Sequence, residues 1–301
     1  MKSLKGYILI LGGTIFWGVS ATFAKFLFAR QLEPLILVQT RITFSAILML
    51  VYFLLFKPKF LKIKKSDFYM FALVGIVGIA MSNFTYYFTI QEISVSTAIL
   101  IQYMAPLLVI IYAAFTKEES LGWVKITAAA ISIGGIYLTV SGKDFSLTNV
   151  SQIGLITGAA SAFCWAFTNV YLRHVLKHYS VWTILVYSFI AGSIFWLFIN
   201  PPWNLYSANY SPETWIIFIG FAIVSVLIPH TLYFNGLRYI TASRAIITGT
   251  FEPIVAITAS FILLDAFLTP IQIFGAVLVI TAIVILQIKK EEIQEVNIEA
   301  T

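Results

Sequence analysis

The segment ITASRAIITGTFEPIVAITASFILL, from Ile240 to Leu264, decides the fold because it places a carboxylate beside a proline inside an apolar helix of membrane length. The pair is Glu252-Pro253. A charge at bilayer mid-depth costs at least about 2.5 to 3.5 kcal/mol, so such a side chain normally faces protein, water or a substrate. Proline also removes a backbone donor from the same turn. We predict a bend here, with Glu252 binding a substrate ammonium group or carrying a coupling proton; a structural hydrogen bond is the alternative.

An earlier segment has the same arrangement. The stretch ISVSTAILIQYMAPLLVIIYAAF, from Ile93 to Phe115, carries Pro106, which lies 147 residues before Pro253. Further pairs share an offset of 147 or 148 residues: Trp17 and Trp165, Lys25 and Arg173, Tyr86 and Tyr233, Ser96 and Ser243, and Glu118 and Asp265. Their common order and nearly constant offset indicate an internal repeat. Ala105 occupies the position of Glu252 in the first copy, so the proline is shared by both copies and the carboxylate is not.

The composition indicates a polytopic membrane protein. Of the 301 residues, 60% are hydrophobic and 11% charged, and the mean hydropathy is +0.93, whereas soluble domains have about 45 to 50% apolar and about 25% charged residues. About 20 apolar residues span a bilayer. Ten segments of this kind are predicted, at residues 7–28, 34–56, 68–90, 94–115, 121–141, 152–172, 181–199, 214–236, 240–263 and 269–288. The fold class is therefore an all-α integral membrane protein with ten transmembrane helices.

The basic residues predict the orientation. The net charge is +6, but the basic side chains lie in short connections between the apolar segments, as topology determinants do. A cytoplasmic N-terminus places most of them inside and leaves mainly Arg30 and Lys143 outside. We therefore expect a multi-pass protein of the plasma membrane with both termini in the cytoplasm, and no nucleic-acid partner.

The repeat predicts the class of function. Two copies divide the chain into residues 1–145 and 146–290, each with five spans, followed by a cytoplasmic tail at 291–301. An odd number of spans per copy inserts the second copy upside down relative to the first. Such inverted five-helix repeats are typical of secondary transporters, whose similar halves open one central site to either side in turn.

Three segments resemble the EamA-type branch of the drug/metabolite transporter superfamily. They are TIFWGVSATFAK (Thr14 to Lys25), ISVSTAILIQYMAPLLVIIYAAFTKEE (Ile93 to Glu119) and YFNGLRYITASRAIITGTFEPIVAITASFILLD (Tyr233 to Asp265). The resemblance covers nearly the whole chain and implies a central cavity surrounded by spans one, three, four, six, eight and nine. One departure is that the family's frequent Gly-Glu at the end of span four or nine is Lys117-Glu118 and Leu264-Asp265 here.

The sequence lacks the common motifs of chemical catalysis. Gly142-Lys143-Asp144 lacks the upstream glycine and the Ser/Thr of a Walker A motif, and the sequence has no HExxH or GxSxG. Cys164 is the only cysteine, which excludes an intramolecular disulfide. We therefore predict no enzyme activity, no catalytic residues, no cofactor and no metal site.

Polar and aromatic residues inside these six spans are the candidate site. We predict that substrate contacts come from Trp17, Asn83, Tyr86, Tyr87, Gln102, Tyr103, Trp165, His230, Tyr233 and Glu252. Pro106 and Pro253 are predicted at bends where gating helices flex. Arg41 is interpreted as a structural residue held by backbone carbonyls or by Glu33 or Glu92, with anionic substrates as the alternative.

The predicted function is a secondary transporter that exports small organic metabolites, such as amino acids or related amphipathic solutes, by alternating access. Its partners are a small-molecule solute, the lipid bilayer and a coupling proton, although facilitated diffusion fits equally well. An organic cation transporter is the first alternative, because aromatic walls and one carboxylate suit a cation. A polytopic membrane enzyme acting on lipid-linked groups is the second. Monomer and dimer both remain open.

Overall fold

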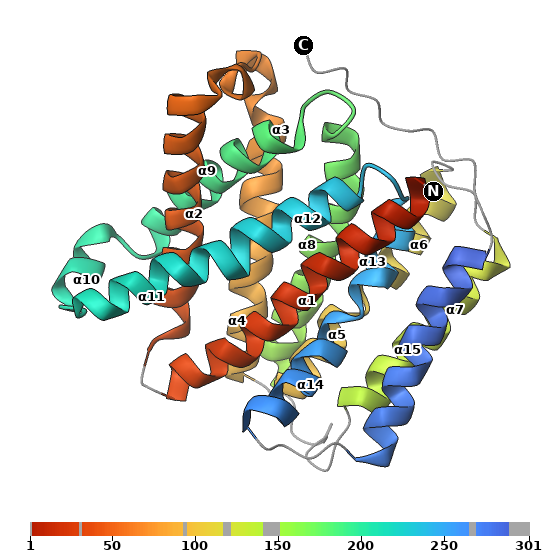
Figure 1. Cartoon of the computed structure of the whole chain (residues 1–301). Coiled ribbons are helices and arrows are strands. Elements are labelled where there is room, and N and C mark those ends of the chain that lie inside the picture. Colours follow the sequence, from red (N-terminus) through yellow and green to blue (C-terminus); the bar gives the residue numbers. More distant parts are fainter. Residues whose placement is uncertain are drawn as a thin grey trace.

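The computed structural model describes residues 2–29, 32–92, 95–116, 122–140, 151–264 and 269–288. Within these ranges every regular element is helical (Figure 1). Glu118, Asp265 and the tail at 291–301 lie outside the described residues, and so do the side chains of Lys25 and Ser96.

Helices occupy all ten predicted segments within the described residues. In chain order they are α1 (Lys2–Ala29); α2 (Pro34–Phe56); α3 (Phe68–Leu73), η3 (Val74–Met81) and α4 (Ser82–Glu92) in one run; α5 (Val95–Gln102) and α6 (Ala105–Thr116); α7 (Trp123–Val140); α8 (Gln152–Val175); α9 (Val181–Ile199); α11 (Pro212–Ala222), η4 (Ile223–Leu227) and α12 (Ile228–Gly236) in one run; α13 (Ala242–Gly249) and α14 (Glu252–Leu264); and α15 (Pro270–Ile288). The connections hold the short helices η1 (Pro58–Leu61), η2 (Lys65–Asp67) and α10 (Pro202–Ser207).

Six of these units are long and apolar enough to cross a membrane by themselves. They are Ser3–Ala24, Leu35–Phe56, Lys65–Thr89, Gln152–Val175, Val181–Ile199 and Pro212–Gly236. The other four predicted spans hold shorter or interrupted helices.

Two of the shorter units are interrupted at matching positions. The α5–α6 unit breaks at Tyr103-Met104 and the α13–α14 unit at Thr250-Phe251, again 147 residues apart. Pro106 and Pro253 each occupy the second position of the helix that follows the break. Proline is tolerated in the first turn of a helix but leaves the carbonyl four residues earlier without its helical donor, which explains why each helix is interrupted there.

The wide helical turns also recur. Residues of η3 and η4 have π-helical hydrogen bonding, in the third and eighth predicted spans respectively. Shifting Val74–Met81 by 147 residues gives 221–228, a range that contains η4. Such local widenings inside α-helices are frequent at functional sites.

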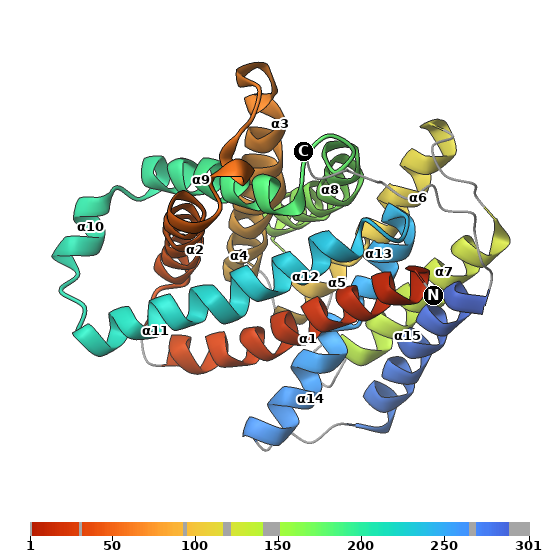
Figure 2. The same ribbon diagram turned by 45° about the horizontal axis from the view of Figure 1, so that its top comes forward.

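Helices of each half of the chain pack against helices of the other half, in matching positions. Helix α1 packs on α12 and α14, and correspondingly α8 packs on α4 and on the α5–α6 unit. Helix α2 pairs with α9, and α7 pairs with α15 at one edge of the molecule (Figures 1 and 2). The central helices α1 and α8 therefore each lie against helices that come mainly from the other half of the chain.

The surface and the interior both fit a lipid environment. Large apolar side chains face outward, for example Phe115 at 84% and Phe198 at 83% exposure. Between helices, buried hydroxyl groups pair directly: Ser132 with Thr250 over 2.9 Å and Thr89 with Thr157 over 2.9 Å. Such contacts are typical of helix association in membranes, where apolar burial supplies no driving force.

Candidate functional site

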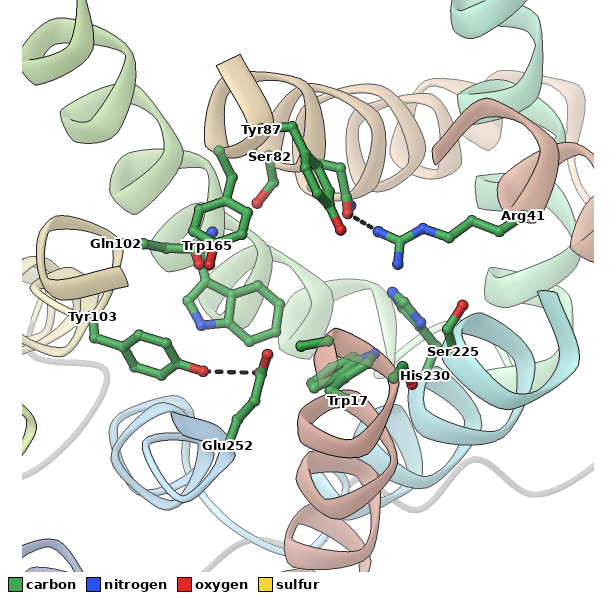
Figure 3. A pocket seen from close by; sticks show the side chains of 15 residues that line it. Trp17, Arg41, Ser82, Tyr87, Gln102, Tyr103, Trp165, Ser225, His230 and Glu252 are labelled. Atoms are coloured by element: carbon green, nitrogen blue, oxygen red, sulfur yellow. Dashed lines mark hydrogen bonds between the residues drawn. The ribbon is translucent and has the colours of Figure 1, made fainter. Parts of the chain in front are cut away.

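A cavity of about 130 Å³ lies where the two halves of the chain meet. A buried water needs about 10 to 15 Å³ measured in this way, so the cavity has room for several waters or one small organic solute. Its walls are formed by Trp17, Ser20, Ala21, Arg41, Gly78, Ser82, Asn83, Tyr86, Tyr87, Gln102, Tyr103, Trp165, Ser225, His230 and Glu252 (Figure 3). They come from all six of the spans expected around a cavity and, in addition, from α2.

One wall is built from two tryptophans that the repeat relates to each other. The rings of Trp17 on α1 and Trp165 on α8 meet edge to face with centroids 5.7 Å apart. Tyr233 on α12 lies 5.2 Å from Trp17 and 5.3 Å from Trp165. Such ring pairs contribute about 0.5 to 1.5 kcal/mol beyond their buried area. Trp17 and Trp165, with Tyr233 packed against both, therefore form an apolar wall shared by both halves.

Tyr233 does not line the cavity, although the sequence predicts it as a substrate contact. It is completely buried behind Trp17 and Trp165, and its hydroxyl donates a 2.6 Å hydrogen bond to Asn169 Oδ1. The amide nitrogen of Asn169 in turn donates to the backbone carbonyl of Trp165 over 2.9 Å. Tyr233 thus supports the tryptophan wall from behind, because its hydroxyl finds a partner inside the protein.

Glu252 reaches the cavity from the first residue of α14, directly after the helix break. Its Oε2 accepts a 2.8 Å hydrogen bond from the hydroxyl of Tyr103, which lies in the break between α5 and α6 (Figure 3). The two interrupted helices therefore bring one acid and one phenol together. The first turn of a helix also suits an acidic residue, since the backbone amides there are partly positive.

Arg41 enters the cavity from α2, which corrects its predicted surroundings. Its Nη2 donates a hydrogen bond to Asn83 Oδ1, and its guanidinium lies 5.8 Å from the centre of the Tyr87 ring. The acids expected as partners, Glu33 and Glu92, do not hold it. The sequence alone shows a positive charge inside a span, but its rotation toward the cavity depends on how α2 packs on α9 and α11.

His230 lies in the wall next to the tryptophans. Its Nδ1 is 2.9 Å from the Val226 carbonyl, which is a hydrogen bond if that nitrogen carries the proton. Trp17 and Phe189 approach the imidazole at centroid distances of 5.1 and 5.5 Å. The ring is therefore held in a fixed orientation at the cavity surface.

Nine of the ten predicted contact residues line this single cavity. The lining residues outside the predicted set are Ser20, Ala21, Arg41, Gly78, Ser82 and Ser225. Small residues such as Gly78 and Ser225 carry no distinctive sequence signal, but each lies on one of the two π-helical segments. Neither segment is foreseen from the sequence.

Comparison with known proteins assigns the family. The EamA-like transporter family matches residues 4–141 and again residues 152–288. The chain belongs to the EamA-like transporter family. As an EamA-like protein of the drug/metabolite transporter superfamily, it is a multi-pass membrane transporter and not an enzyme, as the sequence predicts.

Individual relatives cover nearly the full length. The chain is 21% identical to the uncharacterized inner membrane transporter YicL of Salmonella typhimurium, over 94% of this chain and 95% of the relative. It is 24% identical to the threonine/homoserine exporter RhtA of Escherichia coli strain K12, over 90% of both chains. A crystal structure superposes with a TM-score of 0.73 at 16% identity, over 95% of this chain and 96% of the other. This last similarity shows that the two chains share a fold.

Proposed function

We propose that this protein is a secondary transporter that exports amino acids or related amphipathic solutes by alternating access. One observation carries the proposal: a single cavity holds an acid, a guanidinium and aromatic walls at the position where the interrupted helices meet. Interrupted helices beside a central site are the usual device by which transporters expose backbone polarity to a solute. In this proposal the nine predicted cavity residues contact the solute and Tyr233 supports them.

The proposed architecture is ten spans in two inverted repeats, residues 1–145 and 146–290. It is supported by the two separate family matches, by the matching breaks at residues 103–104 and 250–251, and by the exchanged packing of α1 and α8. The shared prolines Pro106 and Pro253 are the proposed points of flexure. Rocking of one half against the other would open the cavity to each side in turn.

The proposed orientation has both termini in the cytoplasm of the cell. It is supported by the basic residues of the connection between α2 and α3, from Lys57 to Lys65, which then face the inside. The inner membrane relative supports a plasma membrane location. The relative RhtA of Escherichia coli strain K12 is a threonine/homoserine exporter, which supports export as the direction of transport.

An organic cation is a weaker candidate for the solute. Glu252 and the aromatic walls would suit a cation, but the guanidinium of Arg41 in the same cavity would repel it. A solute with both charged and apolar parts fits the lining better.

Reconstitution into liposomes tests this function. Purified protein is offered a panel of labelled amino acids, amines and nucleoside-like solutes, with and without an imposed proton gradient. Uptake of one or more amino acids above that of protein-free liposomes is the expected result. Stimulation by the gradient would establish proton coupling, and equal rates without it would establish facilitated diffusion. Transport of amines alone, or of no solute, would overturn the proposal.

A further inference from the structure

The cavity contains one positive and one negative side chain that do not contact each other. The guanidinium of Arg41 is hydrogen-bonded to Asn83, and the carboxylate of Glu252 to Tyr103. These two described side chains form no ion pair. Figure 3 shows that they enter from opposite sides, Arg41 from α2 and Glu252 from α14. Each charged group therefore has a neutral hydrogen-bond partner, Asn83 for Arg41 and Tyr103 for Glu252, and no partner of opposite charge in direct contact.

Two buried polar atoms at the cavity have no hydrogen-bond partner, one on Arg41 and one on Ser225. Its Nε is buried and has no hydrogen-bond partner, and the same is true of the hydroxyl of Ser225, which is 1% exposed and lines the cavity. Buried polar groups nearly always have a partner, so two such groups at one cavity indicate a place for a ligand or for water. An acceptor group that reached both atoms would satisfy both.

An anionic oxygen pair is the acceptor that a guanidinium suits best. Its planar donors match a carboxylate in a two-point contact, and charge-assisted hydrogen bonds of this kind are about twice as strong as neutral ones. At the other side of the cavity, the Glu252 carboxylate has a second oxygen beyond the one that Tyr103 contacts. An ammonium donor is complementary to that oxygen.

We propose, on the basis of the proposed function, that the cavity selects zwitterions through two opposed poles. Arg41, assisted by Ser225, binds the carboxylate of an amino acid, and Glu252 binds its ammonium group. The tryptophan wall of Trp17 and Trp165 contacts the apolar part of the solute. A zwitterion adds no net charge to the membrane interior and compensates both buried charges at once, whereas a singly charged solute leaves one pole uncompensated.

A matched series of solutes tests the two poles without altering the protein. L-Threonine, L-leucine and L-phenylalanine are each compared with their carboxamide, which lacks the carboxylate, and with their 2-hydroxy acid, which lacks the ammonium group. For each amino acid that liposomes take up, both analogues are expected to compete with the labelled parent roughly 10-fold more weakly or worse, as loss of a hydrogen bond to a charged group implies.

The two possible failures are distinguishable in this experiment. Uptake of a parent amino acid together with equal competition by either analogue overturns the zwitterion proposal and leaves the proposed function standing. Absence of uptake for these three parents and for every other amino acid of the liposome panel overturns the proposed function and the zwitterion proposal with it.

Two substitutions then assign the poles. Arg41→Gln is expected to abolish the preference for the parent over its carboxamide, and Glu252→Gln the preference over its 2-hydroxy acid. A purely structural role would weaken all three solutes equally, and that result would overturn the assignment. Lys59→Gln and Glu213→Gln, which change exposed charges away from the cavity, serve as matched controls. If Arg41→Gln does not fold, Arg41→Lys is used instead: it keeps the charge and is expected to keep a reduced preference over the carboxamide, and complete loss of that preference would overturn the assignment.

Discussion

The hydroxyl of Tyr103 donates a 2.8 Å hydrogen bond to the carboxylate of Glu252, and this contact joins the two interrupted helices across the cavity. Tyr103 lies in the break between α5 and α6, and Glu252 begins α14 directly after the second break. The same hydrogen bond orients the carboxylate of Glu252 and links the first half of the chain, which holds Tyr103, to the second half. Any movement that separates the two breaks must exchange this bond for water or solute.

Removal of that hydroxyl is therefore expected to affect transport more than stability. Tyr103→Phe leaves one carboxylate oxygen of Glu252 without its donor, and a hydrogen bond to a charged group contributes about 1.5 to 3 kcal/mol. We expect the initial rate of uptake into liposomes to fall by roughly 10-fold or more, whereas the melting temperature in detergent falls only slightly because water in the cavity can replace the lost donor. Tyr52→Phe removes a hydroxyl from an exposed ring on α2 and is the control. Equal rates for the two variants would contradict the coupling role.

Neutralising Glu252 is expected to change how transport responds to pH. If this acid carries the coupling proton, Glu252→Gln can no longer exchange it, so the uptake rate falls and becomes nearly independent of pH from mildly acidic to mildly basic conditions. The measurement is initial uptake across that pH range, with Glu213→Gln at the exposed start of α11 as the control. Normal transport with an unchanged pH profile would show that Glu252 neither binds nor couples.

The prolines after the breaks are expected to set the balance between access states. Alanine at Pro106 or Pro253 supplies the missing backbone donor to the carbonyl of Gln102 or Gly249 and favours a continuous helix. A change of about 1.4 kcal/mol in the balance shifts the ratio of states roughly tenfold.

Cysteine labelling from the two sides of the membrane measures that ratio. Ala21, which lines the cavity, is replaced by cysteine in a Cys164→Ala background. A reagent that cannot cross the membrane is then expected to label the proline variants mainly from one side. Pro58→Ala, in the exposed connection after α2, is the control. If the proline variants show the same ratio of labelling from the two sides as Pro58→Ala, the prolines do not act as points of flexure.

Two adjacent glycines of α7 are expected to respond in opposite ways. A methyl group at Gly135 would lie 2.8 Å from the Gly275 carbonyl oxygen and 2.8 Å from Val279 Cγ2 on α15, whereas one at Gly134 would meet nothing within 4 Å. Gly135→Ala should therefore destabilise the α7–α15 pair by about 1 to 3 kcal/mol through overpacking. Gly134→Ala should be neutral or stabilise the helix by about 0.5 to 1 kcal/mol.

Thermal unfolding in detergent distinguishes the two glycine variants. A lower melting temperature for Gly135→Ala with no decrease for Gly134→Ala is the expected result. Equal changes would mean that α7 and α15 do not approach as closely as the structure shows.

The predicted helix segments agree closely with the structure because their signal is local. The second predicted span, 34–56, coincides with α2, and the seventh, 181–199, with α9. The breaks near Pro106 and Pro253 are also local, since a missing amide hydrogen interrupts a helix wherever the residue stands. The site required more than local chemistry: no local signal predicts that Arg41 reaches the cavity and bonds Asn83 rather than backbone carbonyls, Glu33 or Glu92, or that Tyr233 lies behind the tryptophans instead of in the cavity wall.

The sequence by itself determined the membrane class, the positions of the helical segments, the internal repeat and the asymmetric carboxylate at Glu252. Only the tertiary structure decided which way each helix is rotated: that Arg41 faces the cavity, that Tyr233 stands behind the tryptophans, and that Tyr103 meets Glu252. The physical reason is that lipid is as apolar as a protein core, so a membrane helix needs no polar outer face and its periodicity does not reveal its inner one. Rotation follows from packing between helices that are far apart in the chain.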